Sequence, residues 1–152
     1  MAYKTITLLG DPIRMERVAI AAFSPGFLVE IDSAGGFVKH NSAGATAATM
    51  FALEDENQGK DIDDAYVAAT QALVGFFRPG NEVYAQLANG ETAVIGTLLE
   101  SNGDGYLRAV DADTSIGLVG IQSVVGIALE ALDMSGSSGV DPSSQFIRVL
   151  VI

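Results

Sequence analysis

Short runs in which apolar and polar residues alternate fill most of the sequence, and glycine, proline or asparagine stands at their ends. The alternation is clear at 27–32, where Phe27, Val29 and Ile31 share one face, and again at 82–87. A period of two places successive side chains on opposite faces of a half-buried β-strand. Further runs of this kind predict strands at 37–40, 49–53, 71–78, 92–99, 106–110, 124–132 and 146–152.

The stretch 24–56 predicts a small antiparallel meander onto which the rest of the sheet is built. Pro25-Gly26 and the Ala34-Gly35-Gly36 segment are turn signals on either side of its first strand. Farther along, Asn89-Gly90 predicts a hairpin that joins 82–87 to 92–99. A glycine-rich turn at 101–105 precedes the strand at 106–110.

Two segments allow a helix as well as a strand. Apolar side chains at 62, 66, 69 and 73 have helical spacing, with Asp61 as an N-cap, but a β-like run follows. We therefore expect at most a short helical turn near 62–68. The apolar stretch 118–132 contains glycines, each of which costs a helix about 1 kcal/mol relative to alanine. Two extended pieces are expected there instead, with 124–132 the stronger.

These elements predict an all-β protein: a compact single-domain antiparallel sandwich or barrel of about eight to ten short strands. Residues 23–152 form its single β-rich domain. Residues 1–22 are extended and apolar, and Pro12 disfavours a helix across them. This segment is either an edge strand of the protein's own sheet or an N-terminal arm that adds a strand to a partner's sheet.

Composition and charge exclude several function classes. The 152 residues contain no cysteine, which rules out disulfides, cysteine-ligated metals and thiol catalysis. A net charge of −11 argues against binding to nucleic acid or to anionic membranes. Residues 1–22 carry 3 − 2 = +1 and the rest 5 − 17 = −12, so a weakly basic segment precedes an acidic body. The N-terminus lacks the features of a signal peptide, and synthesis in the cytoplasm is expected.

Candidate chemistry is sparse. The acids of 54–56 and of 61–64 could hold calcium through oxygen ligands but lack the EF-hand pattern, and Asp111/Asp113 lack a third ligand. The single histidine, His40, has no nucleophile motif beside it, and the glycine-rich turns contain no phosphate-loop motif. We therefore expect no cofactor, no bound metal and no enzymatic activity.

Several segments together resemble small head-decoration (cement) proteins of tailed bacteriophages, and the resemblance covers nearly the whole chain after about residue 20. The segments that carry it, in order, are PGFLVEIDSAGGFVKH (25–40), FALEDENQGKDIDDAY (51–66), PGNEVYAQLANG (79–90), LLESNGDGYLRAV (98–110), VGIALEALD (125–133) and IRVLVI (147–152). One departure is 69–71, Ala-Thr-Gln, where a glycine-containing turn is expected before the strand.

The resemblance implies a structural protein of the virion. Such a protein would bind the outer surface of the phage head, bridge subunits of the major capsid protein and form a homotrimer. Its N-terminal arm, here 2–17, would pair with the capsid. The residues expected to face the capsid are Tyr3, Lys4, Ile6, Leu8, Arg14 and Arg17. A small-ligand-binding or carbohydrate-binding β-barrel remains the alternative.

Overall fold

The structure is a computed structural model that describes residues 3–110, 124–136, 142 and 144–152. These residues form thirteen β-strands and one short 3₁₀ helix. In chain order they are β1 (Thr7–Leu9), β2 (Ile13–Val18), β3 (Val29–Ile31), β4 (Phe37–Lys39), β5 (Met50–Ala52), η1 (Glu56–Gln58), β6 (Gln71–Phe76), β7 (Glu82–Gln86), β8 (Thr92–Ala93), β9 (Leu98–Ser101), β10 (Leu107–Ala109), β11 (Val124–Ala128), β12 (Leu132–Asp133) and β13 (Phe146–Val151). No helix in the described part of the chain is long or apolar enough to span a bilayer.

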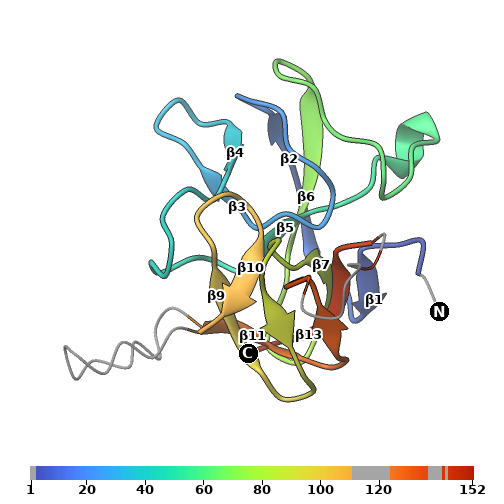
Figure 1. Cartoon of the computed structure of the whole chain (residues 1–152). Helices are drawn as coiled ribbons and strands as arrows, with labels where there is room; N and C mark the ends of the chain where they lie inside the picture. Colours follow the sequence, from blue (N-terminus) through green and yellow to red (C-terminus); the bar gives the residue numbers. More distant parts are fainter. Residues whose placement is uncertain (1–2, 111–123, 137–141, 143) are drawn as a thin grey trace.

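The largest element is a six-stranded antiparallel sheet with the order β1-β7-β13-β11-β9-β10. Its last strand returns toward the second one through a parallel bridge between Leu87 and Leu107. The Ala88 N–H also donates to the Leu107 carbonyl at 2.8 Å. The sheet therefore curls into a barrel-like tier, seen in the lower half of Figure 1.

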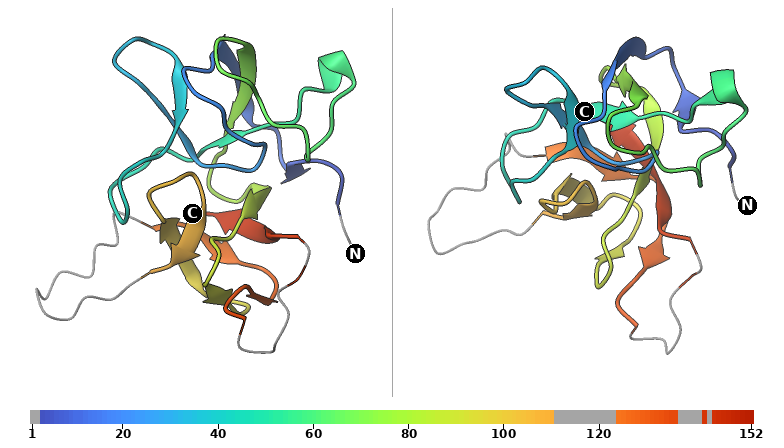
Figure 2. Two further views of the ribbon diagram at one scale, coloured as in Figure 1. Left: turned by 45° about the horizontal axis from the view of Figure 1, so that its top comes forward. Right: turned by 90° about the horizontal axis from the view of Figure 1, so that it is seen from above.

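A second tier lies against the first and contains the sheet β2-β6-β5 and the hairpin β3-β4. Figures 1 and 2 show these strands grouped apart from most of the strands of the second half of the chain. The short pair β8-β12 completes the described ladders.

Two apolar cores meet at the sheet β2-β6-β5. On β5, Phe51 belongs to the larger core, which is shared with the barrel-like tier. Met50 and Ala52 belong to the smaller core, which lies under the β3-β4 hairpin. On β6, Leu73 packs against both cores. Because β5 is buried on both faces, its sequence is uniformly apolar and does not alternate.

The predicted all-β fold class is confirmed, and most predicted strands form within a few residues of the expected bounds. The predicted hairpin between 82–87 and 92–99 is wrong. The turn at Asn89-Gly90 does form, but β7 pairs with β1 and β13, and the segment 92–99 divides into β8 and the start of β9. Both edges of β7 are already occupied, one by β1 and the other by the apolar strand β13. This division is one reason why more strands form than the eight to ten expected.

The segment 62–68 stays within the expectation of at most a short helical turn: the Asp64 N–H donates to the Asp61 carbonyl in a single turn. Beyond it, the Tyr66 N–H donates to the Phe23 carbonyl, and the Tyr66 hydroxyl donates to the Leu53 carbonyl at 2.6 Å. One other local expectation differs from the structure. In the expected meander, β3 and β4 pair as a hairpin, but β5 pairs with β6. The six-stranded sheet is built around β7, β13 and β11, and not around 24–56.

Within this chain, the described part of 1–22 lies against the body. β1 pairs with β7, and β2 pairs with β6 over its full length of six residues. Ile6 is 0% exposed in the larger core, and Ala19 is 0% exposed in the smaller one. The segment thus supplies edge strands to both tiers.

Candidate interaction surfaces

The outer edge of β2 is the longest open strand edge of the second tier. The Leu53 N–H donates to the Leu73 carbonyl, and the Phe77 N–H donates to the Thr49 carbonyl. The odd-numbered residues of β6 therefore direct their backbone N–H and C=O groups toward β5. The even-numbered residues therefore bond to β2, where Met15 is the partner of Val74. It follows that Arg14 and Glu16 direct their backbone N–H and C=O groups away from β6.

Apolar side chains accompany this open edge. Ile13 and Val18 at the two ends of β2 are exposed, as is Ile20 just beyond it. Ile13 lies directly opposite Phe76 on β6, which is exposed as well. Near the C-terminal end of β2, Ala19 forms a parallel bridge with Phe37, so β4 covers only that end. An open edge with apolar flanks is the kind of surface to which another chain can add a strand.

The structure separates the predicted capsid-facing residues into two groups. Ile6 is a core residue, and Leu8 is partly buried against the same core. Tyr3 packs edge-on against Tyr84 with ring centroids 5.4 Å apart, and the Arg148 guanidinium lies 5.7 Å from its ring centroid. These three apolar and aromatic side chains hold the segment to the body.

The charged members of the predicted set are exposed. Arg14 forms an ion pair with Glu56 at 2.7 Å, and Arg17 donates to the Gly35 carbonyl at 2.9 Å. Lys4 is exposed and lines a pocket of about 340 Å³ together with Tyr3, Tyr84, Phe146 and the acids Asp61 and Asp63. Lys4 and the two arginines of β2 are therefore the part of the predicted set that a partner can reach directly.

The acidic loops use carboxylates as local hydrogen-bond acceptors. Asp61 accepts from the Asp63 N–H, and Asp64 accepts from the Asp61 N–H, both at 2.9 Å. Glu54 accepts from the Ile6 N–H at 3.0 Å. Among the described residues, no group of three potential metal ligands lies close together. Asp111 and Asp113 lie outside the described residues.

His40 is buried at the junction of β4 and the β9–β10 turn. Its Nδ1 lies 2.6 Å from the Ser101 hydroxyl, and its Nε2 lies 3.6 Å from a Glu30 carboxylate oxygen. This order of groups resembles a serine hydrolase triad, but Ser101 is 0% exposed and its hydroxyl also accepts from the Gly103 N–H. The Ser101 hydroxyl is thus closed off from solvent, and its contacts with His40 and Gly103 hold the turn.

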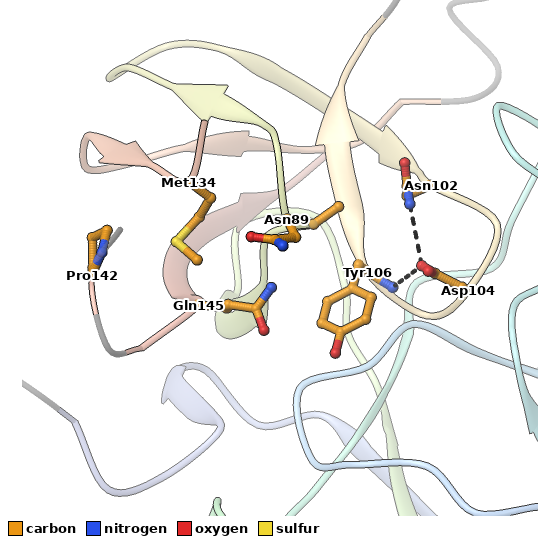
Figure 3. A pocket seen from close by; sticks show the side chains of 8 residues that line it. Asn89, Asn102, Asp104, Tyr106, Met134, Pro142 and Gln145 are labelled. Carbon is orange, nitrogen blue, oxygen red and sulfur yellow. Dashed lines mark hydrogen bonds between the residues drawn. The ribbon is translucent and has the colours of Figure 1, made fainter. Parts of the chain in front are cut away.

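A pocket of about 490 Å³ lies where four chain segments meet beside the barrel-like tier. Asn89 follows β7, Asn102 and Asp104 belong to the β9–β10 turn with Tyr106 after it, and Gln145 precedes β13. Met134 and Pro142 form its apolar side (Figure 3). The asparagines were expected only as turn residues, and no spacing along the sequence connects these segments.

Tyr106 supplies the aromatic ring among the described residues that line this pocket. Its ring packs against Phe27 at 4.6 Å between centroids, and burial, with a smaller contribution from the Asp104 charge, raises the pKa of its phenol above the usual value. Asp104 in turn accepts a hydrogen bond from the Asn102 amide at 3.3 Å. The pocket thus offers an aromatic ring, amides and one carboxylate from a fixed framework.

No protein-family model and no curated protein sequence matches this chain. Among solved structures, the fold is similar to that of the head fiber gp8.5 N base in bacteriophage phi29, with a TM-score of 0.54. The similarity covers 92% of this chain and 93% of the other, at 12% sequence identity. A likeness at this identity concerns the fold.

Proposed function

We propose that this protein is a structural component of a bacteriophage head that binds the outer surface of the capsid. It acts as a decoration (cement) protein, stabilises the shell by bridging major capsid subunits, and has no enzymatic activity. The observation that carries the proposal is the fold likeness over nearly the full length of a head fiber base. The order of turn and strand segments that resembles head-decoration proteins supports the same role.

The contact with the capsid is made by the open edge of β2. Backbone groups of Arg14 and Glu16 are available there for a strand of the capsid protein, and Ile13 and Val18 add apolar area at the two ends. Main-chain hydrogen bonds provide affinity in this mode, and the flanking side chains provide specificity. Of the capsid-facing residues expected from the sequence, the proposal retains Arg14 and Arg17 on β2, together with Tyr3 and Lys4, which line the pocket of about 340 Å³.

The protein acts as a homotrimer. Three linked copies engage neighbouring capsid subunits together, so that individually weak contacts give tight binding. Light scattering should give a mass three times the 15.8 kDa of one chain. A monomer at micromolar concentration would remove the trimer from the proposal.

The decisive experiment mixes the purified protein with capsids that lack it and measures co-sedimentation, followed by electron cryomicroscopy of the decorated shells. The test variant is Glu16→Pro, which removes an N–H that faces away from β6 and leaves the β2–β6 ladder intact. We expect at least a ten-fold loss of capsid affinity. Glu16→Ala is the matched control, because it removes the carboxylate but keeps the N–H.

Thermal unfolding of Glu16→Pro shows whether the variant remains folded. If it does not, Ile13→Lys places a charge at the exposed end of the strand and tests the same edge. Capsid binding by folded Glu16→Pro at wild-type affinity would refute the contact through β2. Failure of the unaltered protein to bind any head would refute the proposed function.

A further inference from the structure

We propose that the pocket between Asn89, Asn102, Tyr106 and Gln145 binds a neutral carbohydrate. The inference is independent of the capsid role, because the pocket lies at the junction of the β9–β10 turn with the segments after β7 and before β13, and β2 does not line it. Its volume of about 490 Å³ falls within the range of about 300–1,000 Å³ that is typical of small-ligand sites.

Hydrogen-bonding groups without a protein partner line the pocket. Within the described part of the chain, the Asn89 amide and the Tyr106 hydroxyl have no hydrogen-bond partner. Gln145 uses its Nε2 to donate to the Leu87 carbonyl at 3.1 Å, which leaves its Oε1 as an acceptor. In Figure 3, Gln145 lies below Asn89 on the side of Met134, and Tyr106 lies below Asn89 on the side of Asp104. Primary amides both donate and accept, which matches adjacent hydroxyls on a sugar ring.

The position of these groups is set by the fold. The bond to Leu87 holds Gln145, the bond to Asp104 holds Asn102, and packing against Phe27 holds the Tyr106 ring. Groups fixed before binding lose little conformational freedom when a ligand arrives. The partly exposed Tyr106 ring also offers an apolar face for the C–H groups of a sugar.

Charge selects against acidic ligands. Asp104 is the one charged residue among the described residues that line the pocket, and no lysine or arginine accompanies it. On a chain with a net charge of −11, a phosphate or a uronic acid would meet repulsion here without a compensating cation. A neutral, hydroxyl-rich ligand fits the same groups without that repulsion.

The test applies the full-length protein to an array of neutral and uronic-acid oligosaccharides and measures the bound sugars by saturation-transfer NMR titration. We expect a neutral oligosaccharide to bind and Asn89→Ala to weaken it at least five-fold. The control variant is Asn57→Ala, which removes an exposed amide on η1, outside the pocket, and should leave the affinity unchanged. Asp104→Asn should reduce the discrimination against uronic acids.

The inference is overturned if no neutral sugar binds above background, or if Asn89→Ala and Asn102→Ala both bind the sugar as the unaltered protein does. Asn89 makes no side-chain bond within the described structure, so its replacement is not expected to disturb folding. Capsid binding without sugar binding would overturn this inference alone. Sugar binding without capsid binding would overturn the proposed function alone.

Discussion

Replacing Arg108 with alanine should destabilise the fold strongly, because the buried Glu100 carboxylate loses its ion pair with the guanidinium. Arg108 and Glu100 lie directly opposite each other on β10 and β9, with Nε and Oε1 2.9 Å apart. The Glu100 side chain is 5% exposed and the Arg108 side chain 28%. The carboxylate of this pair is therefore much less hydrated than the guanidinium, which water already reaches in part.

The expected magnitude follows from this difference in burial. Removing one partner of a fully buried pair costs about 3–5 kcal/mol. Because Arg108 is partly exposed and water can enter the space it leaves, we expect about 2–3 kcal/mol for Arg108→Ala. Glu100→Gln should cost less, since the remaining guanidinium can be hydrated. Urea unfolding followed by circular dichroism measures both.

The chain contains a matched exposed pair as a control. Arg14 and Glu56 are 2.7 Å apart, closer than the buried pair, but their side chains are 52% and 55% exposed. Exposed ion pairs contribute about 0–1 kcal/mol, so Arg14→Ala should cost little and its effect should disappear in 1 M salt. If Arg108→Ala costs no more than Arg14→Ala, burial does not determine the strength of these pairs and the reasoning is wrong.

Two further predictions concern single residues. Ala69 has a φ of 68°, a left-handed conformation that costs a residue with a Cβ about 1–2 kcal/mol. Glycine avoids this cost but has more conformational freedom in the unfolded chain, which offsets part of the gain. Ala69→Gly should therefore stabilise the protein by about 0.5–1 kcal/mol. Gly59 is the control, because its φ is 69° and a Cβ added there would meet no atom within 4 Å. Gly59→Ala should lower the free energy of unfolding in urea. If both variants change that free energy in the same direction, the argument is wrong. Burial raises the pKa of Tyr66 to about 12, so the folded state keeps a proton that the unfolded state releases above about pH 10. Stability should therefore fall between pH 10 and 12, and the advantage of the wild type over Tyr66→Phe, about 1 kcal/mol at pH 8 from the bond to Leu53, should vanish in that range; a constant difference across the titration would refute it.

The turn residues in the sequence predicted where strands form better than which strands pair with each other. The glycine-rich turn at 101–105 joins β9 and β10 as expected, because both strands are adjacent in sequence. At Asn89-Gly90 the turn also forms, yet β7 pairs with β13, about sixty residues farther along the chain. Partner choice between strands depends on which apolar faces bury best together, and that competition is not visible in a local pattern.

The same limit applies to the candidate surfaces. An apolar N-terminal segment was recognised from the sequence, but the burial of Ile6 and the exposure of Ile13 depend on which sheet each strand joins. The expectation of a glycine-type turn at 69–71 was correct in its geometry, since Ala69 adopts the left-handed conformation that glycine favours. The residues of the pocket for which carbohydrate binding is proposed could not be foreseen, because its amides come from segments that only the tertiary fold assembles.

β6 connects the open edge of β2 to the interior of the whole molecule. Its Val74 faces the smaller core opposite Met15 of β2, while Leu73 packs against both cores. A strand added beside β2 would restrain β6 and, through it, the barrel-like tier on the other side. Attachment to a shell should therefore raise the melting temperature of the entire domain in one cooperative step, so that heat resistance of the bound protein becomes a direct readout of its docking.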